Sequence, residues 1–599
     1  MPRQVREVSS STAGLVIIFA LMMLVGTSNV ILFHKVYLHR QSSSHDFQTN
    51  EFVKQIINEL QRKPANEELD GELDGEDPLL DTSLEDTTQD TPQETPVKKS
   101  KHKAINENTA DHHPIAGLNC KDHGGPADPS EMIYWNDIPA DSNYISPFYD
   151  EEKYITFEPD AGGFNNIRMA YETIFVLAHA TGRTLVLPPE KQMYLLSKGG
   201  SKHKKDFTFN DFFHLDSIAF EHAGINIITM EEFLKRKGIT GELKDLTSGQ
   251  VVKPPKDQID WNGKNLNPLF EYLRKVGKFP EGWNPNECIA AIPSNQDPKN
   301  VQELNKIFDD IQALKYGPIP DPLKDFVNEP VDVDGSVKDR MREMLATRKH
   351  LCVYDEELQR EPLLHFKVDH AVKARMLTHF YAFIFFQDWK QDLFYKRFVR
   401  DHIRYVDEIV CAAARIVDAV RERSRKHSAS NTEGLYDSWH VRRGDFQYKN
   451  VKVDVDQLDK QSKDELKDGP MSLYIATDER DKSFFEPLKK KYDVMFLDDF
   501  MHLIEGVNPN YYGMLDQLVA YKGRVFFGTW FSTLSGYINR MRGYYSVKAK
   551  SEGYELGTLP SYYFVPKDKK FQMTKYMPVK LPIYMREFPT SWRDIDKSL

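Results

Sequence analysis

The sequence has few cysteines and no site for N-glycosylation. Four cysteines in 599 residues are too few to hold a disulfide-stapled scaffold together, and none of them forms a Cys-x-x-Cys pair. Asn-x-Ser/Thr is absent, so N-glycosylation is not expected. Glycine (32) and proline (33) are near average, which excludes collagen-like and wholly disordered chains. The length suggests three to four domains of ~150 residues, or two large α/β domains.

Negative charge exceeds positive charge, with 90 Asp and Glu against 79 Lys and Arg. The net charge of -11 argues against nucleic acid as the main partner. Most of this charge lies in residues 64–96, which contain twelve Asp or Glu and no Lys or Arg, so the rest of the chain is near neutral. Because such a segment buries too little apolar surface to offset chain entropy, we expect residues 34–125 to form a disordered stem.

Charged residues are absent between Val8 and Phe33, and residues 13–33 are strongly apolar. At ~1.5 Å per residue, a helix of this length spans the ~30 Å hydrocarbon core of a bilayer. We predict a cytosolic tail over residues 1–12 and a transmembrane signal-anchor over residues 13–33. The protein would then be a single-pass type II protein of the Golgi or ER membrane with its bulk in the lumen. A cleaved signal peptide ending near residues 26–28 is the alternative.

The cysteines are compatible with a lumenal location but do not define a pairing. One or two disulfides can form among Cys120, Cys288, Cys352 and Cys411. Because Cys411 lies in an apolar helical stretch, we predict that it is simply buried.

Beyond the stem, the pattern predicts alternating strands and helices. A strand at Tyr154–Glu158, a turn at residues 162–166, a helix at residues 167–180 and a strand at Thr184–Leu187 form one β-α-β unit. Later strands are predicted around Trp439 and at residues 473–476, 494–497 and 525–527. Helices at residues 482–492 and 514–521 separate the last of them, and this order indicates a second, parallel, doubly wound sheet. Two such halves would bind a ligand at the carboxyl ends of their strands.

We therefore predict an N-terminal Rossmann-like domain over residues 126–430 and a second domain over residues 431–599. Residues 238–350, rich in Pro, Lys, Asp and Asn, would be an insertion in the first domain. The second domain ends in an aromatic-rich tail, which we expect to pack across a domain surface.

The sharpest motif is Trp439-His440-Val441-Arg442-Arg443-Gly444-Asp445. His440 and Arg442 share a face of the strand, because side chains alternate. An arginine at the strand end can fork two N–H donors onto a diphosphate, and Asp445 can hold its guanidinium. The alternative is an ordinary strand that ends in a cluster of charged residues on the surface, with no ligand.

Two further motifs follow predicted strands. Gly528-Thr529-Trp530-Phe531-Ser532-Thr533-Leu534-Ser535 joins a buried strand to a helix, where hydroxyls and free N–H groups can bind an anion or merely cap the helix. Gly162-Gly163-Phe164-Asn165-Asn166 opens the first β-α-β unit but is not a dinucleotide fingerprint. Ala476-Thr477-Asp478 ends another strand and can place a carboxylate near a ribose or base.

Together these stretches resemble the GDP-fucose protein O-fucosyltransferase family, especially its plant-type members. The Gly-Gly-Phe-Asn-Asn-Ile-Arg run resembles the first family motif, and His440-Val441-Arg442 is similar to the His-x-Arg signature. Asp478, Asp516-Gln517 and the loop at residues 528–535 match later blocks in the same order. The resemblance covers about residues 150–190 and 435–545.

The resemblance implies a GT-B fold of two facing Rossmann-like halves, with residues 431–599 forming the nucleotide-sugar-binding domain. It implies an inverting glycosyltransferase that moves fucose from GDP-fucose to a Ser/Thr hydroxyl of a secretory protein, with no cofactor or metal. Arg442 would be catalytic by stabilising the leaving diphosphate. The donor-binding residues would be Gly163, Asn165, His440, Asp445, Asp478, Thr529, Ser532 and Thr533.

The sequence departs from some animal members of the family, because Gly162 stands where they carry a glutamate before Gly-Phe-Asn. The acceptor base is therefore unassigned, and phosphate-assisted proton removal would need no carboxylate. Two other functions remain: a fucosyltransferase acting on a glycan, and a catalytically silent protein that binds sugar nucleotides or glycans. The Asp-x-Asp motifs at residues 332–334 and 454–456 are a further alternative, since a pair of carboxylates can hold a metal ion against a diphosphate.

Overall fold

The computed structural model describes residues 117–136, 138–160, 162–193, 196, 206–313, 331–345, 348–368, 376–444, 448–567, 587 and 589–597. The predicted tail, signal-anchor and most of the stem lie outside these residues, as does Asp445. Among the described residues, no helix is both long and apolar enough to cross a membrane. The predicted domain boundaries stay predictions.

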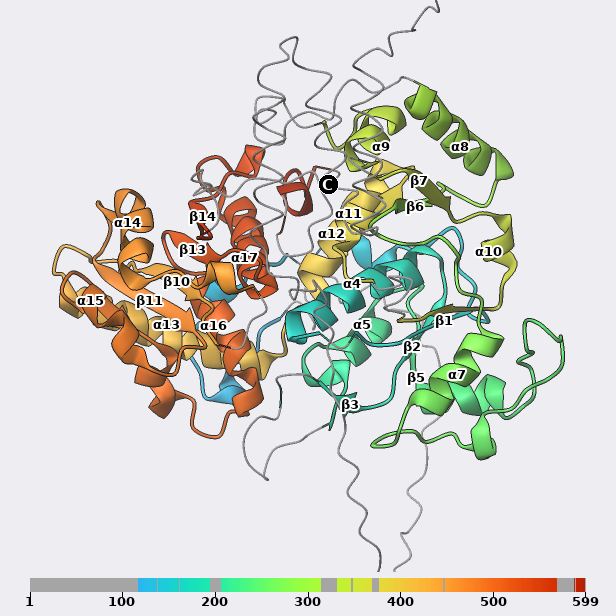
Figure 1. Ribbon diagram of the computed structural model, residues 1–599, viewed down its shortest axis with the longest axis horizontal. Coiled ribbons are helices and arrows are strands. Elements are labelled where there is room, and N and C mark those ends of the chain that lie inside the picture. The colour runs from blue at the N-terminus through green and yellow to red at the C-terminus, as the bar shows by residue number, and fades with distance from the viewer. Residues whose placement is uncertain are drawn as a thin grey trace, which may run out of the picture. The chain divides into compact units, whose positions relative to one another are not determined.

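The first part of the described chain contains two parallel sheets (Figure 1). One has the strand order β5-β2-β1-β8 and the other β7-β6-β9. The strands are β1 (Tyr154–Phe157), β2 (Thr184–Leu187), β5 (Ile227–Thr229), β6 (Cys288–Ile292), β7 (His350–Val353), β8 (Leu363–Phe366) and β9 (Ile384–Phe386). A short antiparallel pair is formed by β3 (Lys191–Gln192) and β4 (Asp206–Phe207).

The helices of this part cover both faces of the β1 sheet. Ile155 packs with residues of α4 (Phe164–Ala180) on one face, whereas its neighbour Tyr154 packs with α6 (Met230–Phe233) and α7 (Asn267–Val276) on the other. This division follows from the alternation of side chains along a strand. The other helices are α5 (Leu215–Glu221), α8 (Pro298–Ala313), α9 (Val337–Leu345), α10 (Glu356–Arg360), α11 (Phe380–Phe383) and α12 (Trp389–His402).

The second part has one five-stranded parallel sheet, with the strand order β12-β11-β10-β13-β14. Its strands are β10 (Asp437–Val441), β11 (Ser472–Thr477), β12 (Asp493–Met495), β13 (Phe526–Thr529) and β14 (Ser561–Phe564). Its helices are α13 (Asp407–His427), α14 (Val455–Leu466), α15 (Glu486–Lys489), α16 (Tyr512–Ala520) and α17 (Thr533–Ala549). The predicted parallel sheet is thus confirmed.

Alternation again divides the core of this sheet. Trp439 of β10 and Ile475 of β11 pack with α14 and α15 on one face, and Tyr474 of β11 packs with α13 and α16 on the other. The predicted β-α-β unit is confirmed at β1, α4 and β2, with the helix starting three residues earlier, at Phe164. Its N-terminal turn can begin there because Gly162 accepts a close approach of Asn166 that a side chain would block.

All four cysteines form disulfides, Cys120 with Cys411 and Cys288 with Cys352. The prediction that Cys411 is simply buried was therefore incomplete: it is buried inside α13, but it also bonds a residue 291 positions away. Periodicity locates a buried helical position, whereas the partner depends on how the chain returns in three dimensions.

Candidate active site

The carboxyl ends of β10 and β13 adjoin where the strand order of the five-stranded sheet reverses. In chain order the strands run outward from β10 to β11 and β12 on one side, and through β13 to β14 on the other. At such a switch point the connecting segments leave the sheet on opposite sides, which opens a crevice for a ligand. The two sharpest sequence motifs follow these two strands.

His440, Thr529 and Ser535 form a buried hydrogen-bonded chain at this point. His440 Nδ1 lies 2.6 Å from Ser535 Oγ, and the Thr529 N–H donates to the same hydroxyl at 2.9 Å. The Thr529 hydroxyl donates to the His440 carbonyl at 2.8 Å. Burial is the main cause that lowers the pKa of His440 to about 3, with Arg442 adding to the effect and Asp478 opposing it. The imidazole is therefore neutral at physiological pH.

Arg442 is fixed at the end of β10 by contacts of both its backbone and its side chain. Its N–H donates to the Thr529 hydroxyl at 2.9 Å, and its guanidinium Nη1 lies 2.8 Å from Asp478 Oδ2. Its side chain is 22% exposed, so the guanidinium is held in place while still reaching solvent. A positioned and accessible guanidinium can bind an anion without first being ordered.

The Asp478 carboxylate accepts several hydrogen bonds from the turn that follows β10. Besides Arg442, its carboxylate accepts the backbone N–H groups of Arg443 at 2.7 Å and Gly444 at 3.0 Å. A Cβ at Gly444 would lie 2.3 Å from Asp478 Oδ2, so only glycine allows this approach. The structure thus gives Asp478 a role in holding Arg442, which its sequence context did not indicate; contact with a base or ribose stays a prediction.

Arg443 points elsewhere and is fully engaged. Its side chain pairs with Glu479 at 2.9 Å and donates to the Val453 carbonyl at 3.1 Å. Its guanidinium carbon lies 3.7 Å from the centre of the Phe484 ring. Of the two consecutive arginines, Arg442 is therefore the one at the switch point.

The loop from Thr529 to Ser532 leads directly into α17. Phe531 has a φ of 67°, which is strained for an aromatic residue, and its ring packs 4.6 Å from that of Tyr448. This turn places Ser532 just before the helix and Thr533 at its first position. Hydroxyls and N–H groups in this setting favour an anion.

Asn165 connects the first motif to the second part of the chain. Its Oδ1 accepts the Gln517 Nε2–H of α16 at 2.9 Å, and Gln517 also accepts the Tyr405 hydroxyl at 2.7 Å. Gly163 immediately precedes α4 as its N-cap. The Gly-Gly-Phe-Asn-Asn turn therefore lies against α16. It is also near the start of α17, because the same Gln517 Nε2 donates to the Leu534 carbonyl at 3.4 Å.

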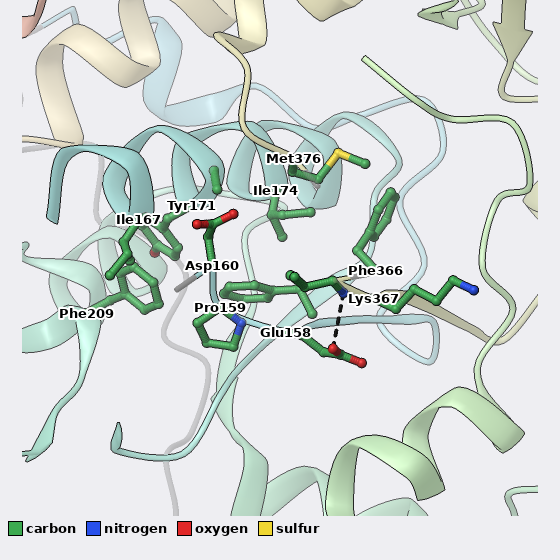
Figure 2. Close-up of a pocket in the computed structure, with 13 residues that line it drawn as sticks. Glu158, Pro159, Asp160, Ile167, Tyr171, Ile174, Phe209, Phe366, Lys367 and Met376 are labelled. Atoms are coloured by element: carbon green, nitrogen blue, oxygen red, sulfur yellow. Dashed lines mark hydrogen bonds between the residues drawn. The ribbon is translucent and has the colours of Figure 1, made fainter. Parts of the chain in front are cut away.

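The two acidic residues after β1 have different surroundings (Figure 2). Glu158 accepts two hydrogen bonds from Arg274, at 2.6 and 2.7 Å, and lies 3.1 Å from His365 Nε2. Burial alone would raise the pKa of Glu158, but hydrogen bonds from His365 and Arg274 outweigh it and bring the pKa to about 2. A carboxylate this acidic and this engaged is a poor proton acceptor.

Asp160 points the other way, toward α4. Its carboxylate accepts the Gly162 N–H at 2.8 Å, and it lines a very small cavity of about 10 Å³ between the ends of β1 and β8. In Figure 2 the carboxylates of Glu158 and Asp160 lie on opposite sides of the chain. The structure therefore does not bring the two acids together as a pair.

The sequence motifs included Ser535 and Gln517 but gave neither residue a role, whereas the structure shows that both organise the loops of the site. Ser535 is the third residue of α17 and Gln517 lies in the middle of α16, so each looks like an ordinary helical polar residue. Both are fully buried, and a polar residue at a buried helical position was the available signal. Neither Asp-x-Asp motif gathers further ligands: no group of three or more His, Cys, Asp or Glu residues suited to a metal occurs in the described ranges.

Comparison with known proteins identifies the family. A model of the GDP-fucose protein O-fucosyltransferase family matches residues 154–545, well over half of the chain. No curated protein sequence matches.

Several solved structures are remotely similar. POFUT1 in complex with GDP is 15% identical, with a TM-score of 0.31 and coverage of 69% of this chain and 99% of that one. NodZ alpha-1,6-fucosyltransferase with GDP is 12% identical, with a TM-score of 0.29 and coverage of 66% and 93%. FUT1 of Arabidopsis thaliana with GDP is 11% identical, with a TM-score of 0.27 and coverage of 70% and 73%. On the family match, the chain belongs to the GDP-fucose protein O-fucosyltransferase family and is a GDP-fucose-dependent glycosyltransferase.

Proposed function

We propose that the protein transfers fucose from GDP-fucose to a Ser/Thr hydroxyl of a secretory protein, with inversion at the fucose C1 carbon and without a metal ion. The observation that supports this most is the position of Arg442 at the β10–β13 switch point, where Asp478 holds its guanidinium and Thr529 accepts its backbone N–H. A nucleoside diphosphate is the ligand class that such a position accommodates.

Arg442 would act on the leaving group. Cleavage of the bond between fucose and phosphate builds negative charge on GDP, and a guanidinium that needs no reorganisation stabilises that charge most in the transition state. The hydroxyls of Ser532 and Thr533, with the N-terminus of α17, would bind the same diphosphate. His440, being neutral, would contribute hydrogen bonding and no charge.

The acceptor proton would pass to the departing phosphate. Gly162 offers no carboxylate, and Glu158 is committed to Arg274 and His365. An oxocarbenium-like transition state leaves the attacking hydroxyl acidic enough to lose its proton late, so that a phosphate oxygen can accept it. This route supports fucosyl transfer with the residues present.

We further propose that the catalytic part lies in the lumen of the ER or Golgi. Two disulfides among four cysteines are typical of an oxidising compartment. The apolar residues 13–33 would anchor the chain as a type II membrane protein. In intact microsomes a C-terminal tag should resist added protease until detergent is present; cleavage without detergent would contradict this topology.

A thermal-shift series tests the donor assignment. The full chain in mild detergent would be heated with GDP-fucose, UDP-glucose and CMP-sialic acid. GDP-fucose at 100 times its Kd should stabilise the fold by about 2.7 kcal/mol and raise the melting temperature. Arg442→Ala should abolish this shift, whereas Arg425→Ala, an arginine at the exposed end of α13, should keep it.

The possible outcomes separate the candidate functions. An absent shift with GDP-fucose, or an equal shift in Arg442→Ala, would overturn the proposed donor site. A shift without fucose transfer to any secretory protein or glycan would instead favour the silent sugar-nucleotide-binding protein. Transfer to free glycans but not to proteins would favour the glycan-directed enzyme.

A further inference from the structure

A buried network of charged side chains joins α4 to α17. Arg168 pairs with Glu172 one turn later in α4, and Glu172 accepts a second hydrogen bond, at 2.8 Å, from Arg540 of α17. The Arg168 guanidinium carbon also lies 3.6 Å from the centre of the Tyr537 ring of α17. The three charged side chains are 0–1% exposed.

Glu587 completes this network from a distant part of the sequence. Its carboxylate accepts a hydrogen bond from Arg540 at 2.8 Å and lies 3.8 Å from Arg168. The Tyr381 hydroxyl donates to it at 2.5 Å, and His379 Nδ1 lies 3.4 Å away. Two arginines therefore face two glutamates, and without Glu587 the buried network would carry an uncompensated positive charge.

The two neighbouring arginines favour the ionised form of Glu587. Burial would raise its pKa, but the charges of Arg540 and Arg168 and the Tyr381 hydroxyl outweigh burial and bring the pKa to about 2. Glu587 lies beyond residue 545, where the family match ends. Its role therefore does not follow from the family motifs.

The network lies directly behind the candidate active site. Arg168 is three residues after Asn165, and Arg540 is five residues after Ser535. Both helices begin at the site. A shift of α4 would therefore separate Asn165 from Gln517 of α16, and a shift of α17 would move the loop that precedes it.

We propose that Glu587 is a positioning residue for the donor site, which acts by holding α4 and α17 in register. It does not contact the donor; it fixes the two helices, and each helix fixes the loop before it. This inference rests on the proposed donor site, and it adds a requirement outside the matched region. Loops held within about 0.5 Å bind and orient a substrate, and small misplacements weaken both.

The test compares two charge-removing variants in the full chain. Glu587→Gln removes the negative charge at nearly constant volume. Asp596→Asn is the matched control, because Asp596 belongs to the same C-terminal region but pairs with Arg400 of α12, at 2.8 Å. GDP affinity would be measured by titration calorimetry well below the melting temperature. Glu587→Gln should weaken GDP binding ~10-fold or more, equivalent to about 1.4 kcal/mol, and Asp596→Asn should change it less than ~2-fold.

Hydrogen exchange supplies a readout that needs no ligand. Glu587→Gln should speed exchange in the first turns of α4 and α17 relative to Asp596→Asn. Should Glu587→Gln fail to fold, Tyr381→Phe removes only one hydroxyl donor to Glu587 and should weaken GDP binding ~2- to 3-fold, a change of about 0.5 kcal/mol.

Each result decides one question. A Glu587→Gln protein that is merely less heat-stable, with unchanged GDP affinity and unchanged exchange at both helix starts, would overturn the inference. If the wild type binds no GDP, the proposed function fails, while the exchange data still decide whether Glu587 holds the two helices.

Discussion

At the residue scale, the candidate site depends on short contacts that leave no room for other side chains. The Asp478 carboxylate contacts Arg442 and two consecutive backbone N–H groups. Gly444 makes this geometry possible, since the carboxylate occupies the space that its Cβ would take. Adding a single methyl group at residue 444 would therefore disturb the positions of Asp478 and Arg442.

Gly444→Ala should reduce fucosyl transfer without unfolding the protein. The new Cβ would displace Asp478 and release Arg442, and a misplacement of about 1 Å can cost ~100-fold in rate. Steady-state kinetics with GDP-fucose would measure the loss. Gly513→Ala is the control, because nothing lies within 4 Å of a Cβ there and alanine suits α16. Equal rates in the two variants would show that Asp478 does not position Arg442.

Glu158 should contribute to stability in a defined pH range. Its pKa falls from 4.5 to about 2 on folding, so the ionised form is favoured in the fold. The stabilisation is therefore fully present above pH ~4.5 and is lost as the pH falls toward 2. Urea unfolding of the wild type and Glu158→Gln should give free energies that differ by about 1–3 kcal/mol at pH 7 and converge only as the pH falls toward 2. A difference independent of pH would refute this assignment.

At the scale of elements, the start of the described chain is attached to α13 by a covalent bond. Cys120 lies before β1 and pairs with Cys411 inside α13. Arg415, one turn later in α13, donates to the Gly125 carbonyl at 3.3 Å. The segment before the first sheet is thus held to a helix that packs on the second sheet.

Replacing Cys120 and Cys411 by serine should lower stability by about 2–5 kcal/mol, because the bond restricts the unfolded chain. Calorimetric melting of the variant under oxidising conditions would show the loss. Reductant should then lower the melting temperature of the wild type more than that of the variant, which has only the Cys288–Cys352 bond left to lose. Equal losses would mean that the Cys120–Cys411 bond does not form in solution.

At the scale of the whole molecule, the C-terminal residues connect elements from both parts of the chain. Trp592 packs against Gly543 of α17, where a Cβ would come within 2.2 Å of the indole. Asp596 pairs with Arg400 of α12, and the Ile595 carbonyl accepts from Arg397 of the same helix at 3.2 Å. The aromatic-rich region is therefore not simply a tail on the surface: Tyr562, Tyr563 and Phe564 belong to β14, and Trp592 is buried in the core.

Trp592→Ala should destabilise the fold by about 3–5 kcal/mol, since the side chain is fully buried and its removal leaves a cavity. Chemical denaturation would measure the change. Leu556→Ala, at a leucine that is 69% exposed, should change stability by less than about 0.5 kcal/mol. Similar effects of the two substitutions would show that the C-terminal residues do not belong to the folded core.

The sequence by itself determined the first β-α-β unit, four of the five strands of the second sheet and the loops that carry the chemistry. It did not predict the strands β5 to β9 or β14. Alternating and helical apolar patterns are local, so the β1-α4-β2 unit and the strands β10, β11 and β13 could be predicted from neighbouring residues. Arg442 could be predicted to end a strand for the same reason.

Only the tertiary structure decided which side chains act together. The pairing of Cys120 with Cys411, the hold of Asp478 on Arg442 and the contact of Glu587 with Arg540 join residues between 36 and 291 positions apart. Such contacts depend on strand order and helix packing, and these follow from the burial of the whole core rather than from any short pattern. Charge balance within a buried network is likewise a property of the assembled fold.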